Sequence, residues 1–202
     1  FRSIRNLFFL SICLAQPVTV LCQSSISLAG RWAFSIDRKD EGVQQKWFDK
    51  ALSDEVTLPG TMLSNKKGDK VSIHTKWTAS IYDSSWYFNP RMAKYRNKDI
   101  PDFPFWLTPD YNYTGVAWYQ KIVNIPSSWS ASQIHLFLER CHTETTVWVD
   151  NHKIGTKNSL VAPHDFDLTN YISPGKHTIS IRIDNRLSTT INVGQDSHSV
   201  TD

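Results

Sequence analysis

The chain has 202 residues, of which 40% are hydrophobic, 12% aromatic and 20% charged, and it contains only eight Gly and nine Pro. This composition excludes collagen, a linker and bulk disorder and allows one large domain with a buried core, whereas a complete (β/α)8 barrel of about 250 residues does not fit beside another domain. The formal net charge is only +3 and no basic stripe is present, so nothing electrostatic favours nucleic acid as a partner.

The N-terminal segment has the pattern of a secretory signal peptide. Arg2 and Arg5 precede an apolar run at Leu7–Ala15. This run is shorter than the ~20 residues of a membrane span but is typical of the apolar centre of a signal peptide with a basic lead. The sequence therefore predicts a signal peptide over residues 1–22, no membrane span, and a mature domain over residues 23–202.

Cysteine usage agrees with export. Cys13 and Cys22 lie inside the predicted signal peptide, so Cys141 has no partner for an internal disulfide. The domain is then expected to be held by its hydrophobic core, and a bacterial periplasm or cell surface is the compartment that fits best. A lipid anchor at Cys22 is the alternative, but Leu21 is not the small residue that normally precedes such a cysteine.

After residue 30, alternating apolar and polar residues predict short β-strands. Asp150-Asn151-His152 reads as the turn of a hairpin, and Ser173–Lys176 reads as a second turn. Helical signals are confined to Asp40–Leu52, where one or two turns fit. The predicted strands lie at Arg31–Asp37, Val116–Ile125, Ile134–Glu139, Thr145–Val149, Lys153–Gly155 and Ile179–Asp184. Many short strands with frequent turns predict an all-β sandwich.

A long aromatic-rich stretch at residues 77–113 interrupts this pattern, with aromatic residues interleaved with prolines. An insert of this length inside a domain is usually functional or disordered, and its aromatic density argues against disorder. We expect an ordered loop insertion that covers a ligand, a neighbouring domain or the end of the sandwich. Its tryptophans Trp77, Trp86 and Trp106 are candidates for stacking on sugar rings. The strand tryptophans Trp32, Trp118 and Trp148 are expected in the core.

Motifs for metal, nucleophilic or phosphate chemistry are missing. The seven histidines have no metal-ligand spacing, and the chain contains neither a G-x-S-x-G elbow nor a Gly-rich phosphate loop. We therefore expect no metal, cofactor or catalytic residue in this chain. Asp165 and Asp167 share one strand face, as a glycosidase pair could, but the favoured interpretation is that Asp167 and Thr169 cap a turn before Tyr171.

Tyr113–Lys121 resembles a strand of the N-terminal sugar-binding domain of family 2 glycoside hydrolases, a group that includes β-galactosidases, β-glucuronidases and β-mannosidases. The similarity covers about residues 28–202, and many short motifs follow one another in the family's order. These further motifs are Leu28–Phe34, Leu58–Thr61, Leu138–Arg140, Val147–Asn151, Ala162–Thr169, Pro174–His177, Ile183–Arg186 and Asp196–Asp202.

The resemblance implies a jelly-roll β-sandwich of the galactose-binding-domain type. In the intact enzyme this domain would be followed by an immunoglobulin-like domain and a (β/α)8 barrel. Family members are retaining hydrolases of O-glycosyl bonds, and both of their catalytic glutamates belong to the barrel. The resemblance therefore implies that the catalytic glutamates lie outside this chain and that the chain alone is inactive.

The resemblance also implies that the segment after the last sandwich strand supplies edge residues to the sugar pocket. On this basis Asp202 and His198 are the predicted substrate-binding residues, joined by Trp106 of the insertion, and Asp184–Arg186 are expected to hold the domain junction together. The predicted function is the first domain of an exported β-glycosidase that acts on a β-linked glycan, forms one wall of the sugar site and braces the barrel. A stand-alone carbohydrate-binding module or lectin is the alternative, and a structural adhesin domain is a third interpretation.

Overall fold

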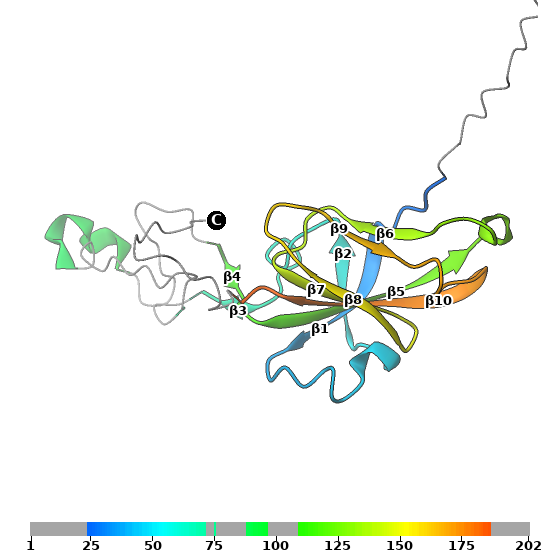
Figure 1. Ribbon diagram of the computed structural model, residues 1–202. Helices are drawn as coiled ribbons and strands as arrows, with labels where there is room; N and C mark the ends of the chain where they lie inside the picture. Colours follow the sequence, from blue (N-terminus) through cyan, green and yellow to red (C-terminus); the bar gives the residue numbers. More distant parts are fainter. Residues whose placement is uncertain (1–23, 72–74, 76–87, 97–108, 187–202) are drawn as a thin grey trace, which may run out of the picture.

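Six antiparallel strands form the main sheet in the order β2-β1-β5-β10-β7-β8 (Figure 1). The computed structural model describes residues 24–71, 75, 88–96 and 109–186. The strands of this sheet are β1 (Gly30–Asp37), β2 (Asp54–Leu58), β5 (Val116–Ile125), β7 (Glu144–Val149), β8 (His152–Asn158) and β10 (Gly175–Asp184). Two further pairs are β3 (Asp69–Lys70) with β4 (Tyr111–Asn112) and β6 (His135–Leu138) with β9 (His164–Asp167). Short 3-10 helices are η1 (Trp47–Asp49), η3 (Pro90–Tyr95) and η4 (Ser127–Trp129).

One face of the main sheet carries the larger hydrophobic core. Alternation along β1 and β10 places Trp32, Phe34 and Ile181 on this face, where each is almost fully buried. The β6–β9 pair lies over them and contributes Leu136 and Phe166 to the same core (Figure 1). This two-layer arrangement confirms the predicted all-β jelly-roll sandwich, with Trp32 in its core.

The opposite face is covered at one end by the segment between β1 and β2. Here Trp118 of β5 and Trp148 of β7 are 0% and 4% exposed, and their ring centroids lie 5.0 Å apart. Phe48 stacks on Trp148 with centroids 5.4 Å apart and an interplanar angle of 5°. Both strand tryptophans are therefore core residues, as predicted. The covering segment forms turns and the single 3-10 turn η1, where one or two helical turns were expected.

Polar residues of the sheet hold this covering segment by its backbone. Gln120 Nε2 donates to the carbonyl oxygen of Trp47 over 2.8 Å, and Ser180 Oγ donates to that of Phe48 over 3.1 Å. Both side chains are buried. The polar positions of β5 and β10 are thus satisfied by the covering segment rather than by solvent.

The predicted turn at Asp150 is confirmed, because Asp150 begins the connection between β7 and β8 with φ 53°. The turn predicted over Ser173–Lys176 is shorter than expected: only Pro174 is bent, and Gly175 and Lys176 already pair with β5 as the start of β10. Cys141 is free and half-buried, and burial raises the pKa of its thiol. No helix in the described part of the chain is long and apolar enough to cross a bilayer.

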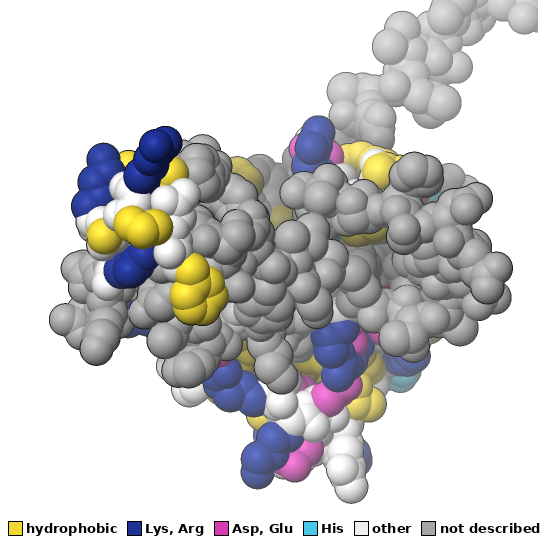
Figure 2. All heavy atoms as spheres, turned by 90° about the vertical axis from the view of Figure 1, so that its left-hand side faces the viewer, with side chains coloured by type: hydrophobic (Ala, Val, Ile, Leu, Met, Phe, Trp, Pro, Cys, Tyr) yellow, Lys and Arg dark blue, Asp and Glu magenta, His cyan; other side chains and the backbone are white. Residues whose placement is uncertain are grey.

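Most of the predicted insertion over residues 77–113 lies outside the described residues. Its described parts are Phe88–Arg96, which includes η3, and residues 109–113, which include β4. The β3–β4 pair lies at the end of the sandwich where β10 finishes (Figure 1). Viewed from this end, Lys and Arg side chains lie beside Asp and Glu side chains on the described surface (Figure 2).

Candidate functional site

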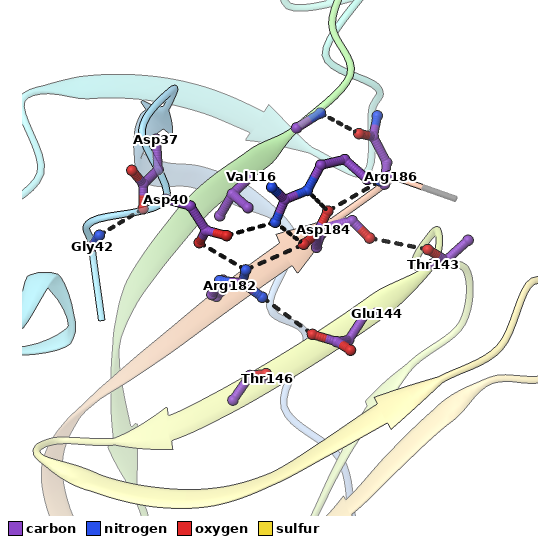
Figure 3. Close-up of polar contacts among 12 residues, drawn as sticks. Asp37, Asp40, Gly42, Val116, Thr143, Glu144, Thr146, Arg182, Asp184 and Arg186 are labelled. Atoms are coloured by element: carbon purple, nitrogen blue, oxygen red, sulfur yellow. Dashed lines mark hydrogen bonds and ion pairs between the residues drawn. The ribbon is translucent and has the colours of Figure 1, made fainter. Parts of the chain in front are cut away.

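The candidate site is the end of the main sheet at which β10 finishes. Antiparallel pairing places Asp184, the last residue of β10, opposite Val116 of β5 and Glu144 of β7, while Asp37 of β1 also pairs with Val116. Four strands therefore meet here, and three of them, β1, β7 and β10, contribute a carboxylate to this end of the sheet (Figure 3). We call the ion-paired residues here the exit cluster, which consists of Asp40, Glu144, Arg182, Asp184 and Arg186.

Arg182 is the buried centre of the exit cluster, with its side chain only 10% exposed. Its guanidinium donates to Asp40 Oδ1 over 2.8 Å, to Glu144 Oε1 over 3.2 Å and to Asp184 Oδ2 over 3.2 Å. The three carboxylates come from the turn after β1, from β7 and from β10 itself. One arginine therefore joins three separate elements by charge-assisted hydrogen bonds (Figure 3).

Arg186 extends the exit cluster to the surface. Its Nε donates to Asp184 Oδ1 over 2.8 Å, and its terminal nitrogen pairs with both Asp40 Oδ2 and Asp184 Oδ2. Asp40 is thus shared between two guanidinium groups. Because Asp40 belongs to the turn after β1, this sharing fastens that turn to the end of β10.

These pairs keep the cluster's aspartates ionised. Burial opposes the ionisation of Asp40, but hydrogen bonds from Arg182 and Arg186 outweigh it, so the pKa of Asp40 lies below its usual value. Burial also opposes the ionisation of Asp184, and hydrogen bonds from Arg186 again outweigh it and lower the pKa. Neither aspartate is therefore a proton donor near neutral pH, and the cluster is suited to holding elements together rather than to acid catalysis.

Asp37 fixes the turn that carries Asp40. Its buried carboxylate accepts the backbone N–H groups of Glu41 over 2.9 Å and Gly42 over 2.7 Å. It also accepts the indole N–H of Trp118 over 3.1 Å. The tryptophan core and the exit cluster thus share this turn.

Asn185 holds the residues just before β5 through two hydrogen bonds, an arrangement that we call the Asn185 bracket. Its Oδ1 accepts the backbone N–H of Gly115 over 2.7 Å, and its Nδ2 donates to the Tyr113 carbonyl oxygen over 2.9 Å. A small polar hollow of ≈ 260 Å³ opens beside the bracket, and its lining includes Arg38, Asp69 and Arg186. The hollow faces the surface at the same end of the sandwich.

A larger groove of ≈ 990 Å³ lies elsewhere, on the core face, with Trp32, Trp129 and Leu136 in its lining. These side chains belong to the hydrophobic core or pack against it. Within the described residues, no group of three or more His, Cys, Asp or Glu could hold a metal ion.

The acidic pair Asp165 and Asp167 does not form a glycosidase dyad. Asp167 Oδ1 accepts the backbone N–H of Thr169 over 2.9 Å, whereas Asp165 pairs with His135 over 3.0 Å. Phe166, between them, points into the core. Asp167 therefore caps the turn before Tyr171, as predicted, whereas the Thr169 hydroxyl accepts the backbone N–H of Ile134 over 3.0 Å and does not cap that turn.

Asp184, Asn185 and Arg186 lie at the end of the sheet where β10 finishes. The structure adds Asp40 and Arg182, which the sequence did not single out. Arg182 alternates with isoleucines and so reads as a solvent-facing position, but the segment after β1 covers it and leaves 8% of the residue exposed. The predicted substrate-binding residues Asp202, His198 and Trp106 lie outside the described residues, as do Trp77 and Trp86.

Comparison with known proteins places this architecture in a family. The family model described as "Glycosyl hydrolases family 2, sugar binding domain" matches residues 26–202. A β-galactosidase of Priestia megaterium is 24% identical over 157 residues, covering 78% of this chain and 14% of that protein. A β-glucuronidase of Paenibacillus borealis is 20% identical over 174 residues, covering 85% of this chain and 23% of that protein.

A solved structure shares the fold of this chain. The structure of a Ruminococcus gnavus β-glucuronidase superposes with a TM-score of 0.52 and 18% identity, covering 81% of this chain and 21% of that one. The chain therefore spans less than a quarter of these relatives' lengths. From the match over residues 26–202, the chain belongs to glycosyl hydrolase family 2, as its sugar-binding domain.

Proposed function

We propose that this domain forms one wall of the sugar site of an exported, retaining β-glycosidase that hydrolyses O-glycosyl bonds in a β-linked glycan. Relatives named β-galactosidase and β-glucuronidase support the reaction class. The chain covers only 14% and 23% of the lengths of these two relatives, which supports the proposal that the domain belongs to a larger polypeptide. An immunoglobulin-like domain and a (β/α)8 barrel would then follow this domain, and the chemistry, with both catalytic glutamates, would belong to the barrel.

The observation that carries this proposal is the match of residues 26–202 to the sugar-binding domain of the family, and the state of the carboxylates at the exit cluster agrees with it. Retaining glycosidases need a nucleophilic carboxylate and a second carboxyl group that can donate a proton. In the exit cluster, arginine holds the pKa of Asp40 and Asp184 below the usual value, so neither is suited to donate. These two aspartates are therefore suited to holding elements together, which agrees with a domain that serves as a wall and brace of the sugar site.

Residue roles follow the sequence prediction. Asp202 and His198 would form the edge of the pocket and bind sugar hydroxyls, while Trp106 of the insertion would offer a flat ring to the glycan. The leader over residues 1–22 would be removed on export, leaving residues 23–202 in a bacterial periplasm or at the cell surface. No cofactor or metal is assigned to the domain.

The experiment compares the longer polypeptide with its pocket-edge variants on aryl β-galactosides and β-glucuronides. Hydrolysis with retention of anomeric configuration is expected, and Asp202→Asn or His198→Ala should lower kcat/KM about tenfold or more. His152→Ala is the control, because His152 is exposed where β8 begins, beside the turn that joins it to β7. Glycan binding by the isolated chain, with no hydrolysis by the longer polypeptide, would instead favour the stand-alone module or lectin.

A further inference from the structure

Asp184, the last residue of β10, and the two residues that follow it are held by several neighbouring elements. Thr143 donates both its backbone N–H and its hydroxyl to the Asp184 carbonyl oxygen, over 3.1 and 3.0 Å. Asn185 brackets Gly115 and Tyr113, and Arg186 pairs with Asp40 and Asp184. Contacts from the turn after β1, the entry to β5 and the entry to β7 thus converge on three consecutive residues (Figure 3).

Folding stability alone does not account for Arg186. Its side chain is 48% exposed, and ion pairs of exposed side chains contribute little to stability. What the contacts of Arg186 and Asn185 do fix is geometry, because Asn185 bonds to the residues just before β5 and Arg186 pairs with Asp40 in the turn after β1. The planar guanidinium and amide groups restrict both position and direction.

We infer that Asn185 and Arg186 are positioning residues: by fixing the two residues that follow β10, they hold the start of the segment to which His198 and Asp202 belong. This inference rests on the proposed function, in which His198 and Asp202 form the pocket edge. A displacement of about 1 Å at a sugar-binding group is enough to lower catalytic efficiency strongly. Rigid support from neighbouring elements is the means by which proteins avoid such displacement.

The test measures kinetics and thermal stability of the longer polypeptide. Asn65→Ala is the control for Asn185→Ala, because Asn65 makes similar side-chain hydrogen bonds to backbone but does not belong to the exit cluster. Its Oδ1 accepts the backbone N–H of Thr57 over 2.7 Å, and its Nδ2 donates to the Thr57 and Thr61 carbonyl oxygens. We expect Asn185→Ala to lower kcat/KM about tenfold or more, and Asn65→Ala to lower Tm at least as much without changing kcat/KM.

A second pair of variants distinguishes a loss of positioning from a simple loss of stability. Arg186→Ala removes the outer ion pairs of the exit cluster, whereas Arg38→Ala removes the exposed pair with Asp69. We expect only Arg186→Ala to lower kcat/KM, with Tm nearly unchanged in both variants. Wild-type kcat/KM in both Asn185→Ala and Arg186→Ala would overturn the inference.

Hydrogen exchange separates this inference from the proposed function. In the longer polypeptide, exchange of peptides from residues 187–202 should become faster in Asn185→Ala and stay unchanged in Asn65→Ala. Faster exchange in a polypeptide without glycosidase activity would support positioning and reject the proposed function. Unchanged exchange in an active enzyme would reject positioning alone.

Discussion

Arg182 is the residue on which this end of the molecule depends most. Its side chain is 10% exposed and contacts three carboxylates, so its charge is compensated where water cannot solvate it. Removing a buried partner leaves charges of one sign facing each other, which costs more than the lost hydrogen bonds.

Replacing Arg182 therefore tests the difference between buried and exposed ion pairs. Arg182→Met keeps much of the side-chain volume and is expected to lower the free energy of unfolding by about 3 kcal/mol. Arg38→Met removes the pair with Asp69, whose partners are 55% and 63% exposed, and should cost less than about 1 kcal/mol. Urea unfolding of both variants measures the difference, and equal losses would contradict the assigned role of Arg182.

The same residues predict how stability depends on pH. Asp40 and Asp184 have folded-state pKa values below their usual values, so the unfolded chain binds more protons in acid. Their contribution is complete above the unfolded pKa of about 4 and is lost as pH falls through the folded pKa.

Urea unfolding between about pH 7 and about pH 3 measures this contribution. Asp40→Asn should flatten the loss of stability below about pH 4 and leave the slope near neutral pH unchanged. An unchanged acid slope in this variant would show that Asp40 is not ion-paired in solution.

At the scale of elements, the segment between β1 and β2 links the tryptophan core to the exit cluster. Gly42 lies directly against Trp118, and a Cβ on Gly42 would lie 2.6 Å from Asp37 Oδ2 and would overlap the indole nitrogen of Trp118. The turn can approach the sheet this closely only because residue 42 has no side chain.

Gly42→Ala is therefore expected to push the segment off the sheet and to cost about 1–3 kcal/mol of unfolding free energy. Gly155→Ala is the control, because its Cβ would meet Phe166 at an ordinary 3.9 Å. A red shift of tryptophan fluorescence in Gly42→Ala alone would report the exposure of Trp118. Equal stability in both variants would contradict the close packing.

The elements themselves could largely be predicted, whereas the cluster that they build could not. Alternation placed Trp32 and Ile181 on a core face, and turn residues marked the β7–β8 hairpin. Alternation also left Arg182 on an apparently solvent-facing side, because the weak helical signal over Asp40–Leu52 does not indicate which face of the sheet that segment covers. The contact of Asp40 with Arg182 joins residues 142 positions apart, which local patterns cannot detect.

The sandwich as a whole is proposed to support a sugar site while the chemistry is performed elsewhere in the polypeptide. The family match, the arginine-paired carboxylates and the small share of the relatives' lengths all agree with that division of labour. The domain would then contribute shape and rigidity, and the strongly held end of β10 is where that contribution would be transmitted.

The most direct test is the activity of residues 23–202 purified alone and of the longer polypeptide, each assayed on the same chromogenic β-glycosides. We predict that the isolated domain folds with a cooperative unfolding transition and releases chromophore no faster than buffer, whereas the longer polypeptide turns over. Turnover by the isolated domain at a rate comparable to that of the longer polypeptide would contradict the account, because a complete catalytic pair would then lie within this chain.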